Sequence, residues 1–448
     1  MTKEIQQETI RGIALRAKAL GGRAMLVGGC VRDALTGRGS ADIDCEVYGL
    51  APQALRSLAA EFGEVDESGA RYGIFSLKGA GIDLAVPRLE RRTGPKHGDF
   101  DVRLDPALPF ARAAARRDFT VNAILQDALT GEIVDPFGGQ DDLRRGVLRA
   151  VPGDGFAEDP LRVLRGAQFA ARFRLSPDAK TLEKMRTMRT DALSPARVLG
   201  EMKKAMASDA PDVFFDVLRR ADALRTWFGE LAALIGVPQP PRYHPEGDAY
   251  THSMRVLHAA AQKKARALRP EAFVFAALTH DLGKAVSTAR GEDGEWHACG
   301  HENTGVPLTR AMLGRLGVNR EIIAYCENMC RLHMRAHVCH YRQAETGETN
   351  LLFDESVCPN DLALLAVCDT LGKGSASGGA DGEAAFLTGR VRVYEETAAR
   401  GLPDGGMLLA AGMEPGPQLA EALAAARRRA LTGETAEEAV QNVLRKRQ

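Results

Sequence analysis

The residues best suited to chemistry in the first half of the chain are two aspartates, Asp42 and Asp44, one residue apart. On a strand, side chains two positions apart point to the same face, so both carboxylates would line one cleft. Two such carboxylates repel each other unless cations lie between them. This is the arrangement of a two-Mg²⁺ site, in which the metals bridge the nucleotide phosphates and the attacking hydroxyl. Asp83 is the candidate for the third, catalytic carboxylate, from a neighbouring strand.

A glycine pair lies upstream of these aspartates, in the string LVGGCVRD at 26–33. Gly28 and Gly29 would let backbone N–H groups approach a triphosphate without a Cβ in the way. Arg32, one turn into the following helix, can add positive charge against the phosphates. A lone D-x-D more often marks a solvated strand or turn, and a lone Gly-Gly indicates even less. Their order along the chain, strand, Gly-Gly, helix and then D-x-D, favours a nucleotide site.

A second cluster of chemically useful residues lies in the other half of the chain. The string FAALTHDLGK (275–284) predicts an apolar helix that carries His280 and Asp281 inside it. Both residues can reach one metal only if neighbouring helices supply further ligands, and His252 and Asp369 are the natural partners. Two histidines and two aspartates suit Ni²⁺, Mn²⁺, Co²⁺ or Zn²⁺. Such a metal would polarise a phosphoryl oxygen and activate a water, and Lys284 could contact the phosphate.

Two simpler interpretations compete with this second site. An isolated His-Asp pair more often caps a helix or forms a salt bridge. The residues Cys326, Cys330, His333 and His337 have ligand types that could hold a structural zinc, but their spacing is compressed onto one predicted helix. Helical periodicity through 320–333 explains these cysteines better as small core residues.

Four ordered strings in the first half of the chain carry a family resemblance. The string at 26–44, LVGGCVRDALTGRGSADID, resembles the signature of class II tRNA nucleotidyltransferases and bacterial poly(A) polymerases, within the polymerase-β-like superfamily. RRDFTVNA at 116–123 resembles the family's RRDFTxNA motif, which implies that Arg117 and Asp118 bind the nucleotide. DPFGG at 135–139 resembles its DPxGG turn, and EDPLRVLR at 158–165 its EDxxRxxR helix.

The EDxxRxxR string has a physical logic of its own. Asp159, Arg162 and Arg165 are spaced by three residues, so on one helix they would share a face. A carboxylate accepts from the exocyclic amino group of cytosine or adenine, an arginine donates to the ring acceptors beside it, and U or G would leave these partners unpaired. The resemblance implies a protein template for CTP and ATP. Without the other strings, a solvated salt bridge would be the simpler interpretation.

The resemblance also indicates the reaction. It implies CCA addition to the tRNA 3′ end, with Mg²⁺ as cofactor at Asp42 and Asp44, and with CTP and ATP as substrates. Residues 88–109 resemble the family's flexible loop, and their full length favours CCA addition over a CC-only enzyme. A-only addition and poly(A) polymerisation stay open as alternatives.

In the second half, the ordered set H…HD…D with HDLGK resembles the HD phosphohydrolase superfamily. The combination with the first half resembles the bacterial multifunctional CCA proteins, which implies hydrolysis of 2′,3′-cyclic phosphates and 2′-nucleotides, and of phosphate esters more broadly. It also makes His297, His301 and His333 accessory candidates. A uridylyltransferase of the kind that modifies the PII signalling protein is a more distant alternative. An RNA-binding protein with degenerate motifs is a further one, against which the intact motifs argue.

These residues need a scaffold that places them. Alternating patterns predict strands at 24–27, 43–48, 72–78 and 81–87, with helices at 8–20, 30–35 and 52–62 and another opening near Arg112. After Gly155, apolar spacing of period 3.6 dominates. We therefore expect an α+β fold, with a small nucleotidyltransferase head of mixed sheet and helices followed by helical parts. The predicted divisions are a head at 1–150, a helical neck and body for template and RNA binding at 151–240, an HD domain at 241–375 and a helical tail at 376–448.

Composition sets limits on partners and compartment. The chain has 448 residues and a formal net charge of zero, which argues against a general polyanion binder but does not exclude a local basic face. The arginine run at 427–429 could meet an RNA backbone, though such a run is more often a solvated face. The N-terminus lacks the apolar region of a signal peptide, and no membrane span is predicted. We expect a cytoplasmic protein, monomeric or homodimeric, with reduced thiols.

Overall fold

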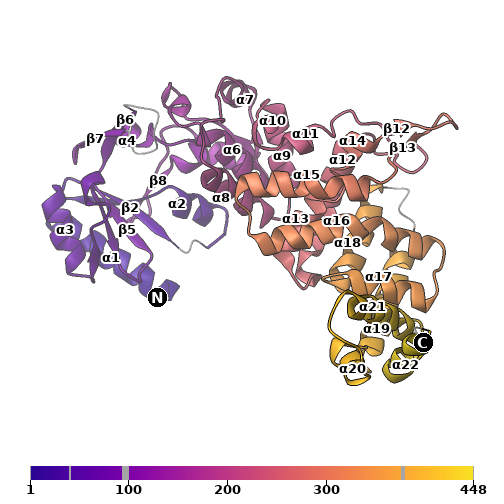
Figure 1. Cartoon of the computed structure of the whole chain (residues 1–448). Coiled ribbons are helices and arrows are strands. Elements are labelled where there is room, and N and C mark those ends of the chain that lie inside the picture. The colour runs from indigo at the N-terminus through magenta and orange to yellow at the C-terminus, as the bar shows by residue number, and fades with distance from the viewer. Residues whose placement is uncertain (1, 40–41, 93–99, 375–378, 447–448) are drawn as a thin grey trace. The chain divides into compact units, whose positions relative to one another are not determined.

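The fold is that of a computed structural model, which describes residues 2–39, 42–92, 100–374 and 379–446 (Figure 1). The chain divides into two compact units. Unit 1 comprises residues 1–193 with 220–223, and unit 2 comprises residues 194–219 with 224–448. This mixed sheet followed by helices confirms the predicted fold class. The predicted boundaries at 150, 240 and 375 remain predictions.

Unit 1 is built on a seven-stranded sheet in the order β3-β4-β5-β2-β1-β8-β9. Its paired strands run antiparallel, except that β2 and β5 are parallel. The sheet strands are β1 (Arg23–Val27), β2 (Ile43–Tyr48), β3 (Val65–Asp66), β4 (Ile74–Leu77), β5 (Ile82–Ala85), β8 (Leu125–Asp127) and β9 (Ile133–Val134). The helices of unit 1 are α1 (Lys3–Ala19), α2 (Gly29–Leu35), α3 (Pro52–Ala60), α4 (Phe110–Ala114), α5 (Gly139–Arg145), α6 (Leu161–Phe173) and α7 (Ala179–Arg186).

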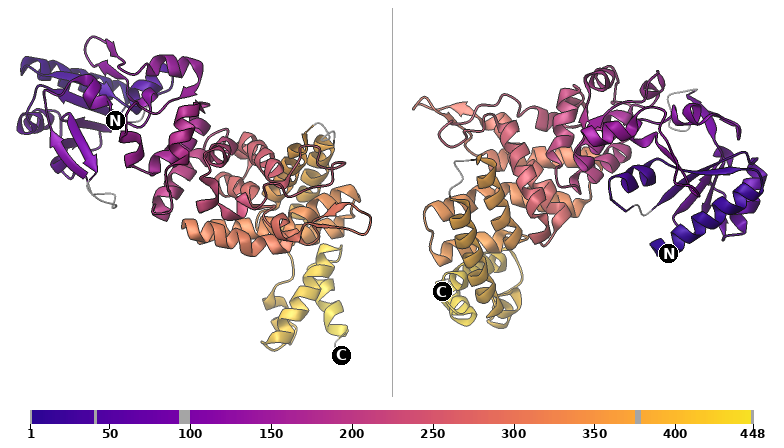
Figure 2. Two further views of the ribbon diagram at one scale, coloured as in Figure 1. Left: turned by 90° about the horizontal axis from the view of Figure 1, so that it is seen from above. Right: turned by 180° about the vertical axis from the view of Figure 1, so that it is seen from behind.

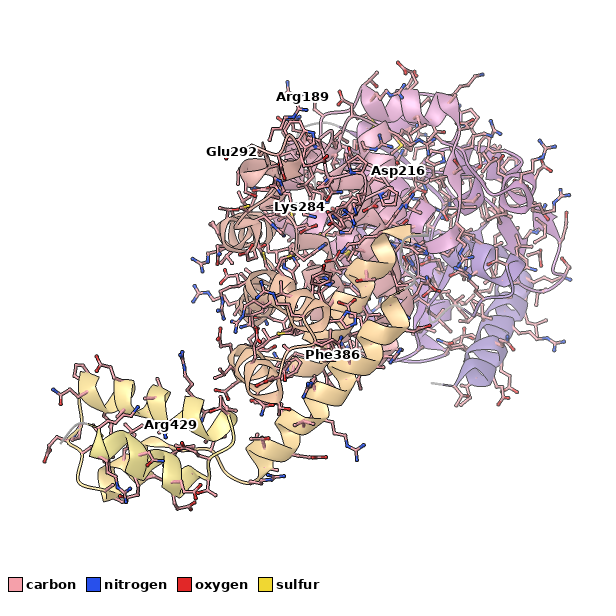
Figure 3. All side chains as sticks on the ribbon, turned by 90° about the vertical axis from the view of Figure 1, so that its right-hand side faces the viewer. Arg189, Asp216, Lys284, Glu292, Phe386 and Arg429 are labelled. Carbon is pink, nitrogen blue, oxygen red and sulfur yellow. The ribbon has the colours of Figure 1, made fainter. Side chains whose placement is uncertain are left out.

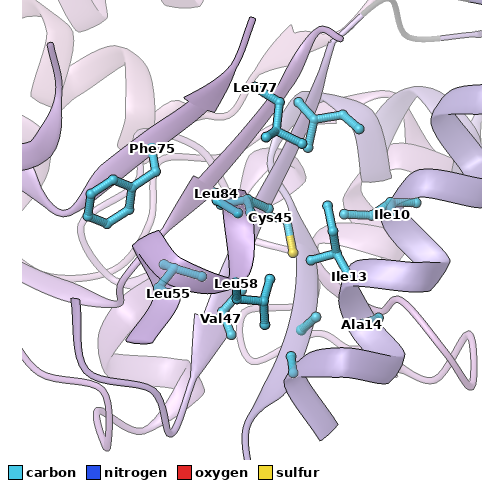
Figure 4. Packing of buried hydrophobic residues seen from close by; sticks show 14 of the residues in the cluster. Ile10, Ile13, Ala14, Cys45, Val47, Leu55, Leu58, Phe75, Leu77 and Leu84 are labelled. Atoms are coloured by element: carbon cyan, nitrogen blue, oxygen red, sulfur yellow. The ribbon is translucent and has the colours of Figure 1, made fainter. Parts of the chain in front are cut away.

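The sheet is held by apolar residues at the spacing that the sequence predicts. In α1, the side chains of Ile10, Ile13, Ala14 and Ala17 recur on one helical face and are buried. Figure 4 shows Ile10, Ile13 and Ala14 gathered with side chains of α3, β2, β4 and β5. Ala17 belongs to the same cluster. Burying a large aliphatic side chain of this kind contributes about 1.5–3 kcal/mol. The cluster therefore fixes the strands that carry the aspartates.

Two local expectations for unit 1 were wrong. Helix α1 begins at Lys3 rather than at residue 8, because the side chain of Thr2 caps its first turn. The loop expected at 88–109 contains a two-stranded hairpin of β6 (Arg88–Arg92) and β7 (Phe100–Leu104). Backbone pairing does not depend on apolar side chains, so this charged segment gave no strand signal. The middle of the predicted flexible loop, residues 93–99, lies outside the described residues.

Unit 2 is almost entirely helical. Its helices are α8 (Pro195–Met206), α9 (Asp212–Arg220), α10 (Leu224–Trp227), α11 (Gly229–Ala232), α12 (Ala249–Lys263), α13 (Pro270–Thr279), α14 (Lys284–Ser287), α15 (His301–Leu316), α16 (Arg320–Tyr341), α17 (Thr346–Glu355), α18 (Pro359–Gly372), α19 (Ala380–Ala399), α20 (Gly405–Ala410), α21 (Pro417–Leu431) and α22 (Ala436–Arg445). A small hairpin of β12 (Ala289–Arg290) and β13 (Trp296–His297) interrupts them. Figure 2 shows α21 and α22 side by side, and their apolar faces share a separate small core. Within the described ranges, no helix is long and apolar enough to cross a membrane.

Candidate active sites

The aspartates of unit 1 meet where two parallel strands lie side by side. The register of β2 and β5 places Asp44 directly opposite Asp83, and Asp42 immediately precedes β2. Burial raises the pKa of Asp44, and the charges of Asp83 and Asp42 raise it further, while Arg117 lowers it. The carboxylates of Asp42 and Asp83 therefore both repel that of Asp44. Oxygen ligands crowded in this way fit Mg²⁺, which would relieve the repulsion.

Gly28 packs against this carboxylate site at the turn from β1 into α2. Its φ of 74° is a left-handed conformation that L side chains rarely adopt. A Cβ at this position would lie 2.7 Å from Nη1 of Arg117 and 3.7 Å from Oδ2 of Asp44. The absence of a side chain thus keeps Arg117 and Asp44 close to the backbone of the turn. Gly29 has ordinary φ, and a Cβ there would come no closer than 3.6 Å to Arg32.

Arg32 is buried and engaged with protein groups. Its Nη1 donates to Oδ1 of Asn122 at 2.6 Å, and its Nη2 lies 2.7 Å from Oδ1 of Asp33. The guanidinium carbon lies 4.0 Å from the centre of the Phe173 ring, and burial lowers the pKa of Arg32. In this state Arg32 ties α2 to the segment around Asn122. Its predicted contact with phosphate stays a prediction.

Glu46 is a buried residue of this site that the sequence analysis missed. Arg116 and Arg117 both donate to its Oε1, at 2.6 Å and 3.1 Å, and the hydroxyl of Tyr48 donates to Oε2. Burial alone would raise the pKa of Glu46, but Arg117 and Arg116 bring it down to about 2. The residue continues the alternation of Asp42 and Asp44 along β2, and that spacing could have identified it. Its charge holds both arginines beside the aspartates.

The predicted template residues separate into two groups. Arg162 donates to the carbonyls of Gly155 and Arg116, at 2.6 Å and 2.8 Å. Arg165 donates instead to Oδ2 of Asp118 at 2.7 Å, and Asp118 also accepts from Asn122. Burial would raise the pKa of Asp118, but Arg165 and Asn122 lower it. Arg165 thereby anchors the Asp118 carboxylate.

Asp159 does not lie on the helix with the two arginines, contrary to the expectation. Helix α6 begins at Leu161, and Asp159 has an extended backbone, because a residue before proline is pushed out of the helical region. Asp159 and Arg162 nevertheless line one cavity of about 730 Å³, together with Tyr72, Arg88 and others. Arg165 does not line it. The cavity is large enough for a nucleobase with its sugar.

In unit 2, the four predicted metal ligands converge from three helical segments. His252 lies on α12 and Asp369 on α18, while His280 caps the end of α13 and Asp281 follows it in the turn. The pair is therefore not inside the helix as expected. Nε2 of His252 lies 2.8 Å from Oδ1 of Asp369, and Nε2 of His280 lies 3.2 Å from Oδ2 of Asp281. All four residues are buried.

The converging atoms of this histidine site face one another at short distances. Among the described residues, no hydrogen bond of good geometry reaches Nε2 of His252 or His280, either oxygen of Asp281 or Oδ1 of Asp369. The polar atoms nearest to them belong to the site itself and to Lys284. Nδ1 of His280 lies 2.9 Å from the carbonyl of Ala277, and Nδ1 of His252 lies 2.7 Å from Glu246. Both Nδ1 atoms thus carry the proton, which leaves the Nε2 lone pairs aimed inward. Buried nitrogen and oxygen atoms that converge in this way fit a divalent transition metal.

Two of the three accessory histidines join the same centre. Nε2 of His301 and of His333 lie 3.1 Å and 3.5 Å from Oδ1 of Asp281, and 3.2 Å from each other. These three residues form one compact ligand set, and His252, His280 and Asp369 form another. Asp281 thus presents one oxygen to each set. His297 stays outside, exposed on the β13 hairpin and paired with Asp293 at 2.8 Å.

His337 and Glu383 complete the surroundings of Asp369 and were not among the predicted site residues. Nε2 of His337 lies 2.6 Å from Oδ2 of Asp369, and Nδ1 lies 2.7 Å from Oε1 of Glu383. Burial lowers the pKa of His337, but the two carboxylates outweigh it and raise the value to about 9. The only sequence signal for His337 was its place in the zinc alternative. Glu383 belongs to α19, within the predicted tail, and gave no signal.

The cysteines of the zinc alternative are core residues. The thiols of Cys326 and Cys330 donate to the carbonyls of Ala272 and His280, at 3.8 Å and 3.3 Å. Both residues are fully buried, and burial raises the pKa of each thiol. They are therefore poor metal ligands and pack α16 against α13.

A cavity of about 850 Å³ opens onto the histidine site. Asp369 and His301, one from each ligand set, line it together with Lys284 and Lys373. Lys284, labelled in Figure 3, also lies 2.6 Å from Oδ2 of Asp281. A small molecule in this cavity would reach both ligand sets.

Comparison with known families agrees with the division into these two sites. Residues 24–149 match the Poly A polymerase head domain, and residues 249–371 match the HD domain. The multifunctional CCA protein of Nitrosococcus oceani is 41% identical over 318 residues, which cover 70% of this chain and 74% of that protein. The multifunctional CCA protein of Xanthomonas campestris is 37% identical over 419 residues, covering 90% of this chain and 96% of that protein.

Solved structures share the fold at lower identity. A CCA-adding enzyme in an apo form has a TM-score of 0.67 and 18% identity, and the match covers 100% of this chain and 97% of that one. A Thermotoga maritima CCA-adding enzyme in complex with tRNA has a TM-score of 0.63 at 18% identity, covering 100% and 97%. A Bacillus stearothermophilus CCA-adding enzyme in complex with CTP has a TM-score of 0.61 at 19% identity, covering 100% and 98%.

Proposed function

The chain belongs to the family of multifunctional CCA proteins, and from this we propose that it adds CMP and AMP to the tRNA 3′ end. The 3′ hydroxyl oxygen attacks the α-phosphorus of CTP or ATP, the P–O bond to the β-phosphate breaks and pyrophosphate leaves. In this proposal Asp83 accepts the hydroxyl proton, and its position opposite Asp44 on the adjacent strand supports that role. Asp42 and Asp44 hold Mg²⁺ in this proposal. Bound Mg²⁺ supplies charge neutralisation for the triphosphate and for the developing transition state.

The remaining residues of unit 1 bind and select the nucleotide. Arg117 is held by Glu46 beside Gly28 and Asp44, where its charge can meet the triphosphate. Asp159 and Arg162 line the 730 Å³ cavity and read the amino group and ring acceptor of cytosine or adenine. Arg165, Asp118 and Arg32 position this assembly through their mutual contacts. The observation that carries the proposal is the in-register pair Asp44 and Asp83.

The test is nucleotide incorporation into tRNA that lacks its CCA end, with CTP and ATP supplied separately and together. CCA addition predicts CMP incorporation with CTP alone and AMP incorporation after it. Incorporation from ATP alone, with none from CTP, would favour A-only addition, and extension beyond one A would favour poly(A) polymerisation. Asp44→Ala should abolish nucleotide incorporation and leave tRNA binding intact. The control is Asp105→Ala, at an aspartate that follows β7 in the same unit, and this variant should retain nucleotide incorporation.

We also propose that the histidine site hydrolyses phosphate esters. The residues that would hold a divalent transition metal such as Ni²⁺ or Mn²⁺ are His252, His280, Asp281 and Asp369. Such a metal would polarise a phosphoryl oxygen and activate a water. The water oxygen bonds to phosphorus, the P–O bond to a ribose 2′ or 3′ oxygen breaks, and that oxygen takes up a proton. Lys284 and Lys373 line the cavity where the phosphate would bind. The convergence of buried Nε2 and carboxylate oxygen atoms from separate helices carries this proposal.

The two activities should separate by mutation. His280→Ala should abolish hydrolysis of 2′,3′-cyclic AMP without reducing CMP incorporation, because the sites lie in different units. His258→Ala, an exposed histidine of α12, is the matched control. Loss of both activities in His280→Ala would contradict independent sites. Cytoplasmic localisation is proposed because tRNA is the substrate.

A further inference from the structure

The cavity at the histidine site has an aromatic wall that phosphate chemistry does not require. Besides the metal-facing Asp369 and His301, its lining includes Tyr243 and Trp296. Its volume of about 850 Å³ is in the range that holds a whole small-molecule ligand, well beyond a phosphate group. A ligand that fills this cavity therefore has a second chemical group besides its phosphate. The aromatic wall indicates which kind of group that is.

Both rings are exposed, which is unusual in this molecule. Among the described residues, three aromatic side chains count as exposed: Tyr243 at 60%, Trp296 at 36% and Tyr341 at 89%. Two of these three line the same cavity, although they are more than fifty positions apart in sequence. A large ring left in water does not contribute the free energy that its burial would provide. A ligand that stacks on the rings would recover it.

Hydrogen bonds fix the backbone that carries each ring. Tyr243 follows Pro240 and Pro241, and its N–H donates to the carbonyl of Pro240 at 3.0 Å. Trp296 lies on β13, opposite Arg290 of β12. The turn of that hairpin is closed by a hydrogen bond of 2.8 Å from the N–H of Gly291 to the carbonyl of Glu295. Both rings are thus presented by preorganised segments, which lowers the entropic cost of binding.

Positively charged side chains lie beside the aromatic wall of the cavity. The guanidinium carbon of Arg242 lies 5.5 Å from the centre of the Tyr243 ring. Lys284 and Lys373 line the cavity on the side of the metal ligands. Aromatic rings with arginine and lysine around them are the groups that bind nucleobases and phosphates in single-stranded nucleic acids.

We propose that Tyr243 and Trp296 are specificity-determining residues of the histidine site: they form a nucleobase platform on which the base of a nucleotide or of an RNA 3′ end stacks while its phosphate is hydrolysed. This rests on the phosphohydrolase function proposed above. The phosphate lies at the metal ligands and lysines, and the base stacks on one or both rings. Because every base has a π-face, the platform selects for a base without selecting which one.

The kinetic test uses the full chain loaded with Mn²⁺. Substrates are 2′-AMP, an oligoribonucleotide ending in a 2′,3′-cyclic phosphate, and glycerol 2-phosphate, which has no base. Trp296→Ala and Tyr243→Ala should each raise KM for 2′-AMP about 10-fold, as expected for loss of one stacking contact, and leave kcat/KM for glycerol 2-phosphate unchanged. Trp296→Phe should restore most of the affinity. Tyr341→Ala, the exposed aromatic outside the cavity, is the matched control.

The outcomes separate the platform from the phosphohydrolase. Equal effects on 2′-AMP and glycerol 2-phosphate, or no effect on either, would overturn the platform. If Trp296→Ala and Tyr243→Ala raise KM only for the oligoribonucleotide, the platform binds the bases of RNA ends. If they raise KM for 2′-AMP as well, it also binds free nucleotides.

A binding measurement keeps the proposal testable if no hydrolysis occurs. The chain has two tryptophans, and Trp227 is buried, so Trp227→Phe leaves Trp296 as the reporter. Saturable quenching of its fluorescence by 2′-AMP at a fixed metal concentration, but not by glycerol 2-phosphate, is expected. Absence of quenching would refute the platform whatever the fate of the phosphohydrolase.

Discussion

His337 holds the carboxylate of Asp369 through a contact of 2.6 Å between Nε2 and Oδ2, which turns the other oxygen, Oδ1, toward His252. His337 is itself held from behind by Glu383 at 2.7 Å, and Glu383 also accepts from Thr370. A helix of the predicted tail therefore orients a predicted metal ligand. Such outer contacts set the direction and basicity of the ligands that they support.

Glu383→Gln should weaken metal binding about 10- to 100-fold, the usual effect of removing a group that orients a ligand. The measurement is titration of the metal-free protein with Mn²⁺, followed by electron paramagnetic resonance. Glu395→Gln, farther along α19, is the control. Unchanged Mn²⁺ affinity in Glu383→Gln would show that Glu383 does not orient the site.

The stability of the metal-free protein should fall as pH rises toward and through about 9. His337 has a pKa raised to about 9, above the ordinary histidine value near 6.5 that applies in the unfolded chain. A raised folded-state pKa contributes stability fully below the unfolded value, and the contribution is lost as pH rises through the folded value. Urea unfolding between pH 6 and 10 should show this loss in the wild type and a smaller one in His337→Gln. A parallel pH dependence in both proteins would contradict the assignment.

Removal of Glu46 should destabilise unit 1. Glu46→Gln leaves Arg116 and Arg117 without their shared buried carboxylate, and breaking one side of a buried pair costs about 3–5 kcal/mol. Since the pKa of Glu46 is depressed to about 2, its contribution is present above the unfolded value near 4.5 and is lost as pH falls through 2. Urea unfolding of wild type and variant at pH 7 gives the difference. Equal stability would mean that Glu46 contributes no net free energy.

Gly28→Ala should lower incorporation more than Gly29→Ala does. At Gly28 a Cβ would lie 2.7 Å from Nη1 of Arg117 and would require a φ of 74°, a strained backbone conformation that costs roughly 1–3 kcal/mol. At Gly29 the backbone is ordinary and the nearest atom is 3.6 Å away. Single-turnover CMP incorporation compares the two variants. Equal rates would argue that Arg117 and Asp44 do not need this close approach.

His301→Ala and His333→Ala should each reduce the amount of metal bound, and His297→Ala should not. The first two present Nε2 to Oδ1 of Asp281, whereas His297 is exposed and paired with Asp293. Equilibrium dialysis with Ni²⁺ or Mn²⁺, with metal content measured by mass spectrometry, gives ions bound per chain. An unchanged count in His301→Ala and His333→Ala would exclude metal binding by this set.

Local patterns predicted most of the scaffold. The glycine turn, the strands bearing Asp44 and Asp83, and the helices bearing His252 and Asp369 follow from spacing, because each pattern reports the face that a side chain takes within its own element. The hairpin of β6 and β7 was missed because its pairing is made by backbone groups across a charged segment. The three-residue spacing of Asp159, Arg162 and Arg165 predicts one helix, but Pro160 forces the residue before it into an extended backbone.

The parts of the site that could not be predicted come from contacts between distant segments. Glu383 reaches His337 across 46 positions, and Arg165 reaches Asp118 across 47. No local period marks either partner, and a carboxylate on an amphipathic helix normally faces water. Only the packed helices show that Glu383 is turned inward.

Because Asp44 is aligned with Asp83, the position of the Asp83 carboxylate depends on the number of residues in the turn between β4 and β5. Leu77 ends β4 and Ile82 begins β5, so residues 78–81 set where Asp83 falls along β2. Gaining or losing one residue in that turn would shift the pairing by one and swing the Asp83 carboxylate into the apolar core. Homologues should therefore keep the residue count of this turn nearly constant, even though none of its side chains need ever meet RNA or nucleotide.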